Sequence, residues 1–443
     1  MERFYPMTHA DAVRMNESLE DIRDAVIGER KRHIFGFHIN DNESDPDAKV
    51  TYLMDAIGLT PAYMDFTNGK WVWGSWEDAF FIPKPCMLKA DGTVDYYLNP
   101  LDYSKKMDGT ASDIDDLTYN GNAMMEWGRD GKKIWYKIVP DDGDDSSCSV
   151  FIADYKADEG YHCYPFCNRS GIYTDHFYTP IYNGSLDANG KLRSMSSVLG
   201  SSICKKKTAA QEAAAAALNN PTGYDIWDTE VFADIVLINL LLVLITKSTN
   251  SQGKVGQGLT DSGSEAVNDG FTTGVHNDKG LFYGTNSGAA GTYANASKVF
   301  GMENWWGFQW RRFRGLANVK GVAKYKMTRK QNDGSTGDDY VISTTASDYN
   351  GYITGGSLPS TSGTFIDKMK FDDKAFIPSS AGGTSSTDYC DGLWTNNNQV
   401  DYASRGGASA YGAQCGAWCL NLYIAASNTY WDFGASPSCK PLL

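Results

Sequence analysis

Residues 299–315, VFGMENWWGFQWRRFRG, combine three Trp, three Arg and several Gly within a short span. This combination indicates a strand and a tight turn, with Trp305, Trp306 and Trp310 filling a core. The three Arg of the stretch are expected to face water or to pair with carboxylates. A binding cage built from the indoles is the less favoured alternative.

The segments on either side of this stretch predict an α+β fold. From residue 35 on, short runs alternate apolar and polar residues between turn signals, as is typical of strands; they are 33–39, 70–76, 78–83, 94–98, 132–139 and 149–155. Two helices are predicted next, an Ala-rich one at 207–218 and one at about 229–247 that is apolar on nearly every face and therefore central. Short strands without another long helix follow at 280–284, 340–344 and 364–371.

A separate helix is predicted at 8–27. Its apolar residues recur in steps of three and four, as in a coiled-coil seam: Ala12, Met15, Leu19, Ile22 and Val26. The seam is too short to hold together alone, so it indicates support from neighbouring elements or from a larger assembly. An amphipathic helix that lies on its own domain remains equally compatible.

Composition excludes several classes of function. The 443 residues carry a net charge of −14 without a dominant basic face, which excludes non-specific nucleic-acid binding. The apolar run 231–245 contains Asp234 and Asn239 and is shorter than the roughly 20 residues that a bilayer needs, so no membrane insertion is expected. Nine Cys, and an N-terminus without an apolar signal segment, lead us to expect free thiols and assembly in a reducing cytosol.

The sequence offers little catalytic chemistry. None of the six His lies beyond His276, and HExxH, GxSxG, P-loop and dinucleotide-binding motifs are absent. Cys415 and Cys419 are the sharpest candidates, because two nearby thiolates can bind a soft metal or form a redox pair. Inert buried thiols are commoner in such an Ala/Gly-rich strand, and nothing supplies a base. We expect no catalytic residue, metal or cofactor, and we expect the acidic tracts 108–116 and 141–145 to be solvated loops.

The C-terminal segment 389–443 has the composition of a recognition surface. It is rich in aromatic residues, which give rigid contact area, and in Ser, Asn and Gly, which give adaptable hydrogen bonds. An ordinary Gly-rich β-meander explains the composition equally well.

Several motifs carry a family resemblance. V-F-G-M-E-N-W-W-G-x-x-W (299–310) resembles the core turn of the C-type-lectin-like fold shared with formylglycine-generating sulfatase-modifying enzymes. S-R-G-G-x-S-x-x-G-x-x-C-G-A-x-x-x-N-L (404–422) and A-A-S-N-T-x-W-x-x-G-A-S-P-S (425–438) resemble the terminal variable region of diversity-generating-retroelement proteins. The similarity is strongest to the major-tropism-determinant kind, found on phage tails in gut bacteria. It also covers 36–46, 124–138 and 229–248, hence most of the chain after residue 35.

The resemblance implies a C-type-lectin-like domain that is β- and loop-rich, has two main helices and is preceded by a short N-terminal helix. Residues 1–35 would be this helix, for tail attachment or oligomerisation. Residues 36–195 would be the β-rich N-terminal part of the lectin-like region, with insertions. Residues 196–443 would be the lectin-like core, which ends in a variable region at 390–440.

In that family, randomised adenines of a template copy are written into the 3′ end of the gene, so selected side chains vary on a constant scaffold. The implied scaffold is Arg405, Gly406, Gly407, Cys415, Gly416, Leu420, Asn421, Leu422, Trp431 and Gly434. The implied variable, ligand-binding positions are Ala408, Ala410, Tyr411, Ala413, Gln414, Trp418, Cys419, Tyr423, Ile424, Tyr430, Asp432 and Phe433. The aromatic members would be the anchors of an exposed contact patch.

The implied function is that of a non-enzymatic receptor-binding protein in the virion tail, assembled in the bacterial cytoplasm. Its partners would be a bacterial surface receptor, protein or glycan, and other phage tail proteins, and a homotrimer is one assembly that the N-terminal helix allows. Calcium-dependent sugar binding is not expected, since the chain lacks the E-P-N triplet of sugar-binding lectins. Two alternatives stay open: a formylglycine-generating-type copper oxidase that uses Cys415 and Cys419, and a lectin-like adhesin or structural tail protein without diversification.

Overall fold

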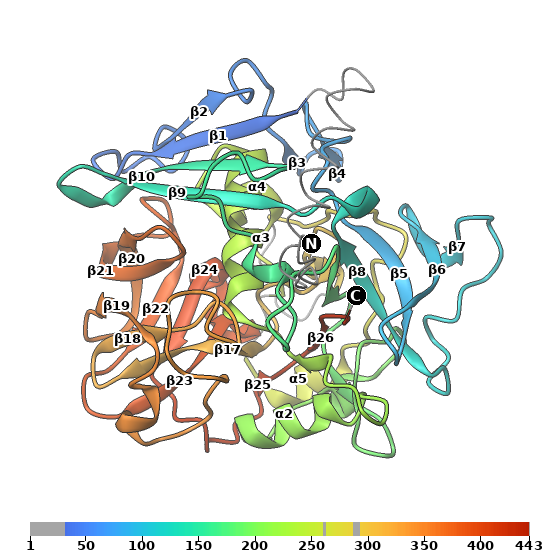
Figure 1. Cartoon of the computed structure of the whole chain (residues 1–443). Helices are drawn as coiled ribbons and strands as arrows, with labels where there is room; N and C mark the ends of the chain where they lie inside the picture. Colours follow the sequence, from blue (N-terminus) through green and yellow to red (C-terminus); the bar gives the residue numbers. More distant parts are fainter. Residues whose placement is uncertain (1–31, 260–262, 287–292, 443) are drawn as a thin grey trace, which may run out of the picture. The chain divides into compact units, whose positions relative to one another are not determined.

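The apolar segment predicted at the centre forms helix α3 (Phe232–Thr246), and all of its residues are buried. In the computed structural model, which describes residues 32–259, 263–286 and 293–442, α3 lies between a four-stranded sheet and a large C-terminal sheet (Figure 1). Ile34–Leu443 form one unit of the chain. The helix predicted at 8–27 lies outside the described residues. Within those residues, no helix has both the length and the apolar character needed to cross a bilayer.

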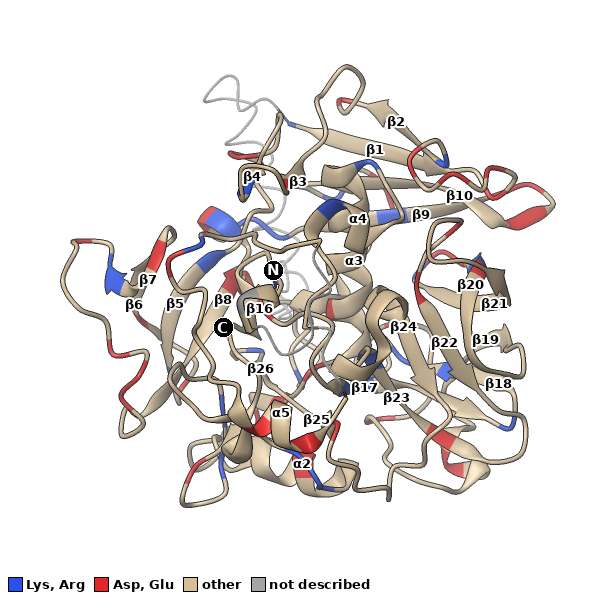
Figure 2. Ribbon diagram, turned by 180° about the vertical axis from the view of Figure 1, so that it is seen from behind, with Lys and Arg blue, Asp and Glu red and all other residues tan. Residues whose placement is uncertain are grey.

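The four-stranded sheet is antiparallel throughout. Its order is β2 (Val50–Met54), β1 (Ile34–Ile39), β10 (Asp144–Ala153) and β9 (Trp135–Asp141). The acidic tract 141–145 forms the turn between β9 and β10 and is largely exposed, as the red tip of this hairpin shows in Figure 2. The prediction of a solvated loop is confirmed there.

A seven-stranded sheet joins distant parts of the chain. Its order is β14 (Trp227–Thr229), β26 (Pro437–Cys439), β11 (Phe177–Pro180), β8 (Gly121–Trp127), β5 (Lys84–Lys89), β6 (Val94–Asn99) and β7 (Asp102–Lys106). Strand β8 is buried at every position. The sheet therefore crosses the boundary expected near residue 195, with β26 seated between β14 and β11.

The C-terminal sheet carries most of the segment that was expected to hold the site. Its main path is β19 (Ile353–Ser357), β18 (Val322–Tyr325), β17 (Trp310–Val319), β23 (Val400–Gly406), β24 (Gly416–Leu422), β22 (Gly392–Thr395), β20 (Thr361–Phe371) and β21 (Phe376–Gly383). Strand β25 (Phe433–Gly434) pairs in parallel with the start of β17. The end of the chain is thereby tied to the Trp-rich stretch.

The remaining regular elements are short. The helices are α2 (Ala209–Ala217), α4 (Ser251–Val255) and α5 (Glu265–Gly270), and three small hairpins pair β3 (Tyr63–Asp65) with β4 (Lys70–Val72), β12 (Ser185–Leu186) with β13 (Leu192–Arg193), and β15 (Lys298–Val299) with β16 (Met302–Glu303). Helix α2 begins with a capping box, in which Thr208 and Gln211 bond each other's backbone. The described part of the chain is thus β-rich with few helices, and both main helices are confirmed.

Two predicted strands are wrong and two are reduced, one of them 70–76, of which only Lys70–Val72 is a strand. Residues 78–83 form turns and 340–344 are irregular, while 280–284 contribute only a single bridge at Tyr283. In 78–83 the apolar side chains are buried or partly buried without strand pairing: Phe80 and Phe81 pack against Phe35 at ring distances of 6.3 Å. The hydrophobicity of these residues predicts burial, and a residue can be buried without belonging to a paired strand.

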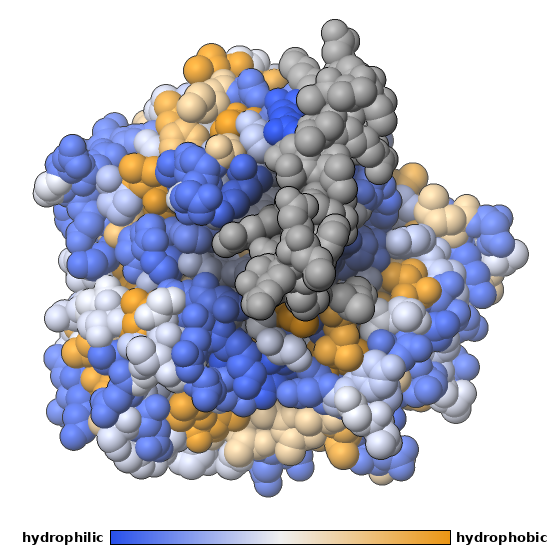
Figure 3. All heavy atoms as spheres, in the orientation of Figure 1, coloured by the Kyte–Doolittle hydropathy of each residue, from blue (hydrophilic) through white to orange (hydrophobic). Residues whose placement is uncertain are grey.

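The Trp-rich stretch forms the predicted core. Trp305, Trp306 and Trp310 are each at most 1% exposed. On the face shown in Figure 3, hydrophobic residues appear as separate groups among hydrophilic ones. The three Arg of the stretch do not face water; they pair with carboxylates, which was the other predicted outcome.

Two of these three Arg, Arg311 and Arg312, belong to ion pairs that are fully buried. Arg311 Nε lies 2.9 Å from Glu230 Oε2, and Arg405 Nη2, from β23, lies 2.6 Å from Glu230 Oε1. Arg405 also stacks over the Trp305 ring at 3.3 Å and donates to its carbonyl at 2.7 Å. Arg312 pairs with Glu212 of α2 at 2.8 Å. These bonds supply the partners that buried charges require.

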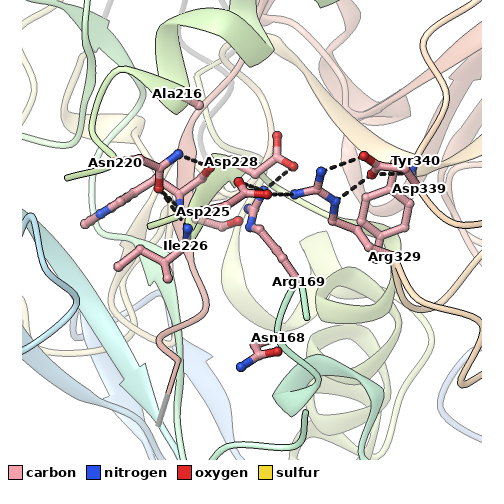
Figure 4. Close-up of polar contacts among 12 residues, drawn as sticks. Asn168, Arg169, Ala216, Asn220, Asp225, Ile226, Asp228, Arg329, Asp339 and Tyr340 are labelled. Carbon is pink, nitrogen blue, oxygen red and sulfur yellow. Dashed lines mark hydrogen bonds and ion pairs between the residues drawn. The ribbon is translucent and has the colours of Figure 1, made fainter. Parts of the chain in front are cut away.

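A further ion-pair network surrounds β14 (Figure 4). The Asp228 carboxylate accepts hydrogen bonds from Arg169 at 2.5 Å and from Arg314 at 2.8 Å. Beside it, Arg329 bonds both carboxylate oxygens of Asp339 and reaches Asp225 at 2.9 Å. The network connects segments near residues 169, 228 and 329, which are far apart in sequence.

Candidate functional site

The alternation of side chains along β24 decides which predicted site residues can face outward. Successive residues of a strand point to opposite faces of its sheet. Trp418 points to the α3 side, where its ring lies 4.8 Å from Phe376 and 5.1 Å from Tyr389, and its Nε1 donates to the carbonyl of Thr249 at 3.0 Å. Cys419 points to the other side. The prediction that Trp418 anchors an exposed patch is therefore wrong.

On the outer side of β24, a cluster of rings forms around Trp310. The Trp310 ring lies 5.2 Å from Tyr411, 5.0 Å from Trp394 and 6.2 Å from Phe433. Tyr411 and Trp394 are themselves 5.0 Å apart, with nearly perpendicular planes. Such edge-to-face contacts fix the rings against one another.

This cluster has a buried floor and a partly exposed upper layer. The floor consists of Trp310, Ala408, Cys419 and Phe433, all at most 4% exposed. Trp394, Tyr411 and Ile424 pack on the floor and remain partly exposed, and Tyr430, 52% exposed, packs on Phe433 at 6.0 Å. We call Trp394, Tyr411, Ile424 and Tyr430 the C-terminal aromatic face. Ala408, Cys419 and Phe433 support this face from below, which corrects their prediction as ligand-contacting residues.

The other predicted positions lie at or near the surface. Ala410, Ala413 and Tyr423 are exposed, whereas Gln414 and Asp432 are partly buried. Gln414 donates from its amide to the carbonyl of Gly363, and burial raises the pKa of the Asp432 carboxyl. The structure thus brings Tyr411, Ile424 and Tyr430 together above one floor. No recorded ring contact joins Tyr423 to that group within the described residues.

The loop that carries Tyr411 is held at several points. This short helical turn, Ser409–Gln414, contains Gly412 in a backbone conformation with φ 49° and ψ −118°. Ser409 Oγ donates to Asn268 at 2.8 Å, and Gln252 donates from Nε2 to the carbonyl of Gly412 at 3.1 Å. The exposed side chains therefore stand on a backbone that is fixed from beneath.

The implied scaffold positions are buried except Trp431, which is partly exposed. Two glycines have a clear steric reason. At Gly406 (φ 84°) a Cβ would lie 2.9 Å from the carbonyl of Trp305, and at Gly416 (φ 151°) a Cβ would lie 2.1 Å from Asp391 Oδ1. Any side chain at these positions would displace the strands that carry the face.

Trp394 and Trp310 are parts of the site that the sequence did not reveal. Trp394 lies on β22, which pairs in parallel with β24 and places Trp394 opposite Asn421. Two strands that pair in parallel are not joined by a tight turn, so no local sequence pattern predicts that β22 pairs with β24. Trp310 was correctly predicted as buried, but its position under the face depends on β17, β23 and β25 meeting.

The two candidate catalytic thiols are buried as well. Burial raises the pKa of the Cys419 thiol well above its ordinary value, with Cys415 and Asp391 adding to the effect, and burial likewise raises the pKa of Cys415. Among the described residues, no group of three or more His, Cys, Asp or Glu is arranged to hold a metal ion. Neutral, enclosed thiols are poor nucleophiles and poor metal ligands.

Comparisons with known proteins add no assignment: neither the family models nor the curated proteins include a match to this chain.

Proposed function

We propose that the chain is a receptor-binding protein of a phage tail, in which a C-type-lectin-like domain presents the C-terminal aromatic face to a surface molecule of a bacterium. The N-terminal segment would attach the domain to other tail proteins, with a homotrimer as the assembly to test. The proposal rests on the family resemblance of the sequence and on the architecture of the face.

One observation carries the proposal. Side chains from two separate loops meet above a buried floor: Tyr411 from Ser409–Gln414, and Ile424 and Tyr430 from the connection between β24 and β25. All three were assigned to the variable set from sequence motifs alone. A fixed floor with exposed aromatic side chains is what a recognition surface needs, because rigid rings give contact area at low entropic cost. Placement on a loop and strand ends also lets these side chains change without disturbing the core.

The corrected set of contact positions follows from burial. We retain Ala410, Tyr411, Ala413, Gln414, Tyr423, Ile424, Tyr430 and Asp432 as positions that could vary and touch a ligand. Ala408, Trp418, Cys419 and Phe433 are removed from it, since larger or polar side chains there would disrupt packing.

Binding to cells tests the proposal directly. Fluorescently labelled protein is incubated with a panel of gut bacteria and measured by flow cytometry. Binding to at least one strain is expected, and the double variant Tyr411→Ala, Tyr430→Ala should reduce it at least ten-fold. The matched control is Tyr224→Ala, an exposed Tyr outside the face that is 44% accessible. Equal binding by the double variant and the wild type would contradict the proposal.

The nucleotide context tests diversification separately. A neighbouring reverse transcriptase and a near-copy of the codons for about 390–440, differing at adenines, are expected. If both are missing while the cell-binding result holds, the protein is a fixed adhesin with the same face. The copper oxidase alternative is disfavoured by the enclosed thiols described above.

A further inference from the structure

A second candidate site lies on the opposite half of the unit, in a cleft of about 970 Å³ between β4, the end of β6 and the loop 278–283. Its volume falls within the range of small-molecule sites. None of the residues of the C-terminal aromatic face lines it. Any function of this cleft is therefore independent of the function proposed above.

Part of the cleft lining is a cluster of aromatic rings packed against one another. Trp71 stacks on Phe282 with ring centroids 4.1 Å apart and planes at 8°, and Trp73 stands at 90° to Phe282 at 5.4 Å. Phe282 contacts the buried ring of Phe300 at 4.8 Å, which connects the aromatic cluster to the core. Both Trp remain partly exposed.

The cleft lining also includes highly exposed apolar side chains. Leu101 and Met107 are 73% and 65% exposed, and both line the cleft with Tyr97. Large apolar side chains that gather in a concave site, rather than singly, mark a place where a ligand is bound. Tyr97 is fixed by a hydrogen bond from its hydroxyl to Glu126 at 2.9 Å.

Charges of both signs surround these apolar walls. The lining includes Lys70, Lys84 and Arg129, but also Glu77 and Asp78. Figure 2 shows the two signs side by side around β4 and the start of β5. Lys84 is paired with Asp130 at 3.2 Å, whereas Glu77 and Asp78 have no ion pair recorded within the described residues.

This mixture restricts the chemistry of the ligand. A fatty chain would bury charged groups without partners, which is costly. A phosphate would be repelled by Glu77 and Asp78, and a simple cation would be repelled by the Lys and Arg side chains. A neutral, polyhydroxylated ring avoids both problems, because each hydroxyl can donate to a carboxylate or accept from an ammonium group.

We propose that this cleft binds a carbohydrate. Trp71 and Trp73 stand at 88° to each other with ring centroids 6.0 Å apart, and Phe282 stacks on Trp71. The C–H face of a sugar ring would therefore pack on the Trp73 indole, while its hydroxyls would bond Glu77, Asp78 and the neighbouring cations. The cleft is then a glycan site separate from the C-terminal aromatic face.

Calorimetry and saturation-transfer NMR on the full-length chain test this assignment. The probes are cellohexaose, maltohexaose and chitohexaose, with laurate, inorganic phosphate and tetramethylammonium representing the rejected classes. Saturable binding of at least one oligosaccharide is expected. Trp73→Ala should weaken it at least ten-fold, Trp73→Phe should retain most of it, and Tyr224→Ala should leave it unchanged.

Glu77→Ala provides a variant whose folding is not at risk, because Glu77 is exposed. It should also weaken oligosaccharide binding, by at least three-fold, with an unchanged melting temperature. The proposal is overturned if no oligosaccharide binds at millimolar concentration, if only laurate, phosphate or tetramethylammonium binds, or if Trp73→Ala and Glu77→Ala both bind as the wild type does.

Discussion

Trp418 is held in the core by both parts of its side chain. Its ring packs on Phe376 and Tyr389, and its indole nitrogen donates to the carbonyl of Thr249. Tyr430, only twelve positions later, exposes half of its surface, and its hydroxyl makes no hydrogen bond to another residue that the structure describes. Two aromatic side chains in one short segment thus have opposite roles.

Alanine substitution should separate these roles. Trp418→Ala is expected to lower the free energy of unfolding by about 3–5 kcal/mol, because it leaves a cavity beside α3 and an unpaired carbonyl. Tyr430→Ala should change it by less than about 0.5 kcal/mol. Urea denaturation measures both. A loss of several kcal/mol for Tyr430→Ala would show that this side chain is structural.

At this scale the sequence predicted the site only in part. The motifs identified the correct segment, and Tyr411, Ile424 and Tyr430 do share a face. Motifs do not state which way a strand faces, so adjacent Trp418 and Cys419 were both assigned outward. Because side chains alternate along a strand, Trp418 and Cys419 cannot face the same side of the sheet. Which of the two faces inward depends on where α3 packs.

At the scale of elements, β14 is secured by charges rather than by length. It has only three residues, and its Asp228 forms ion pairs with Arg169 and Arg314 from two other segments. Burial alone would raise the pKa of Asp228, but Arg169, Arg314 and Arg329 outweigh it and lower the pKa to about 2. The ionised carboxylate is therefore stabilised by folding.

Lowering the pH should remove the contribution of ionised Asp228 to the free energy of unfolding. Since the pKa of Asp228 is lower in the folded state than its ordinary value of 3.8, its stabilisation is complete above about pH 4 and is lost as the pH falls to about 2. The contribution is on the order of 2 kcal/mol. The difference in unfolding free energy between wild type and Asp228→Asn, measured in urea, should shrink by about this amount from pH 5 to pH 2.

The control for this titration is Asp142→Asn in the exposed β9–β10 turn, which has no ion pair recorded within the described residues. Its difference from wild type should stay nearly constant over the same range. A constant difference for Asp228→Asn as well would mean that the network does not stabilise the ionised form.

The elements themselves were predictable where a local signal matched the packing. The Ala-rich run, its capping Thr208 and the apolar α3 are local signals, and both helices form where expected. The segment 78–83 failed because apolar side chains can be buried from turns as well as from strands. The order of strands in the two large sheets depends on contacts between segments that are tens to hundreds of residues apart, which no local pattern encodes.

For the molecule as a whole, every one of the nine cysteines is a buried free thiol. Burial raises the pKa of Cys86, Cys148, Cys204 and Cys439, as it does for the pair near the face. Buried, protonated thiols react slowly. The fold therefore keeps its cysteines without cross-linking them.

Ellman's reagent measures this directly. Fewer than one thiol per chain should react within minutes in the native protein, and all nine should react in guanidinium chloride. A fast-reacting pair that disappears in Cys415→Ala and Cys419→Ala would instead revive the oxidase alternative.

The position of β26 between β14 and β11 has a consequence for how the protein is made. Ribosomes produce residues 437–439 after every other strand of that sheet, so the sheet stays open along two edges until they emerge. A frameshift or premature stop between β14 and β26 leaves those edges bare, and bare strand edges attract chaperones and proteases. Faulty translation products are thus distinguishable from intact ones by their own incomplete folding.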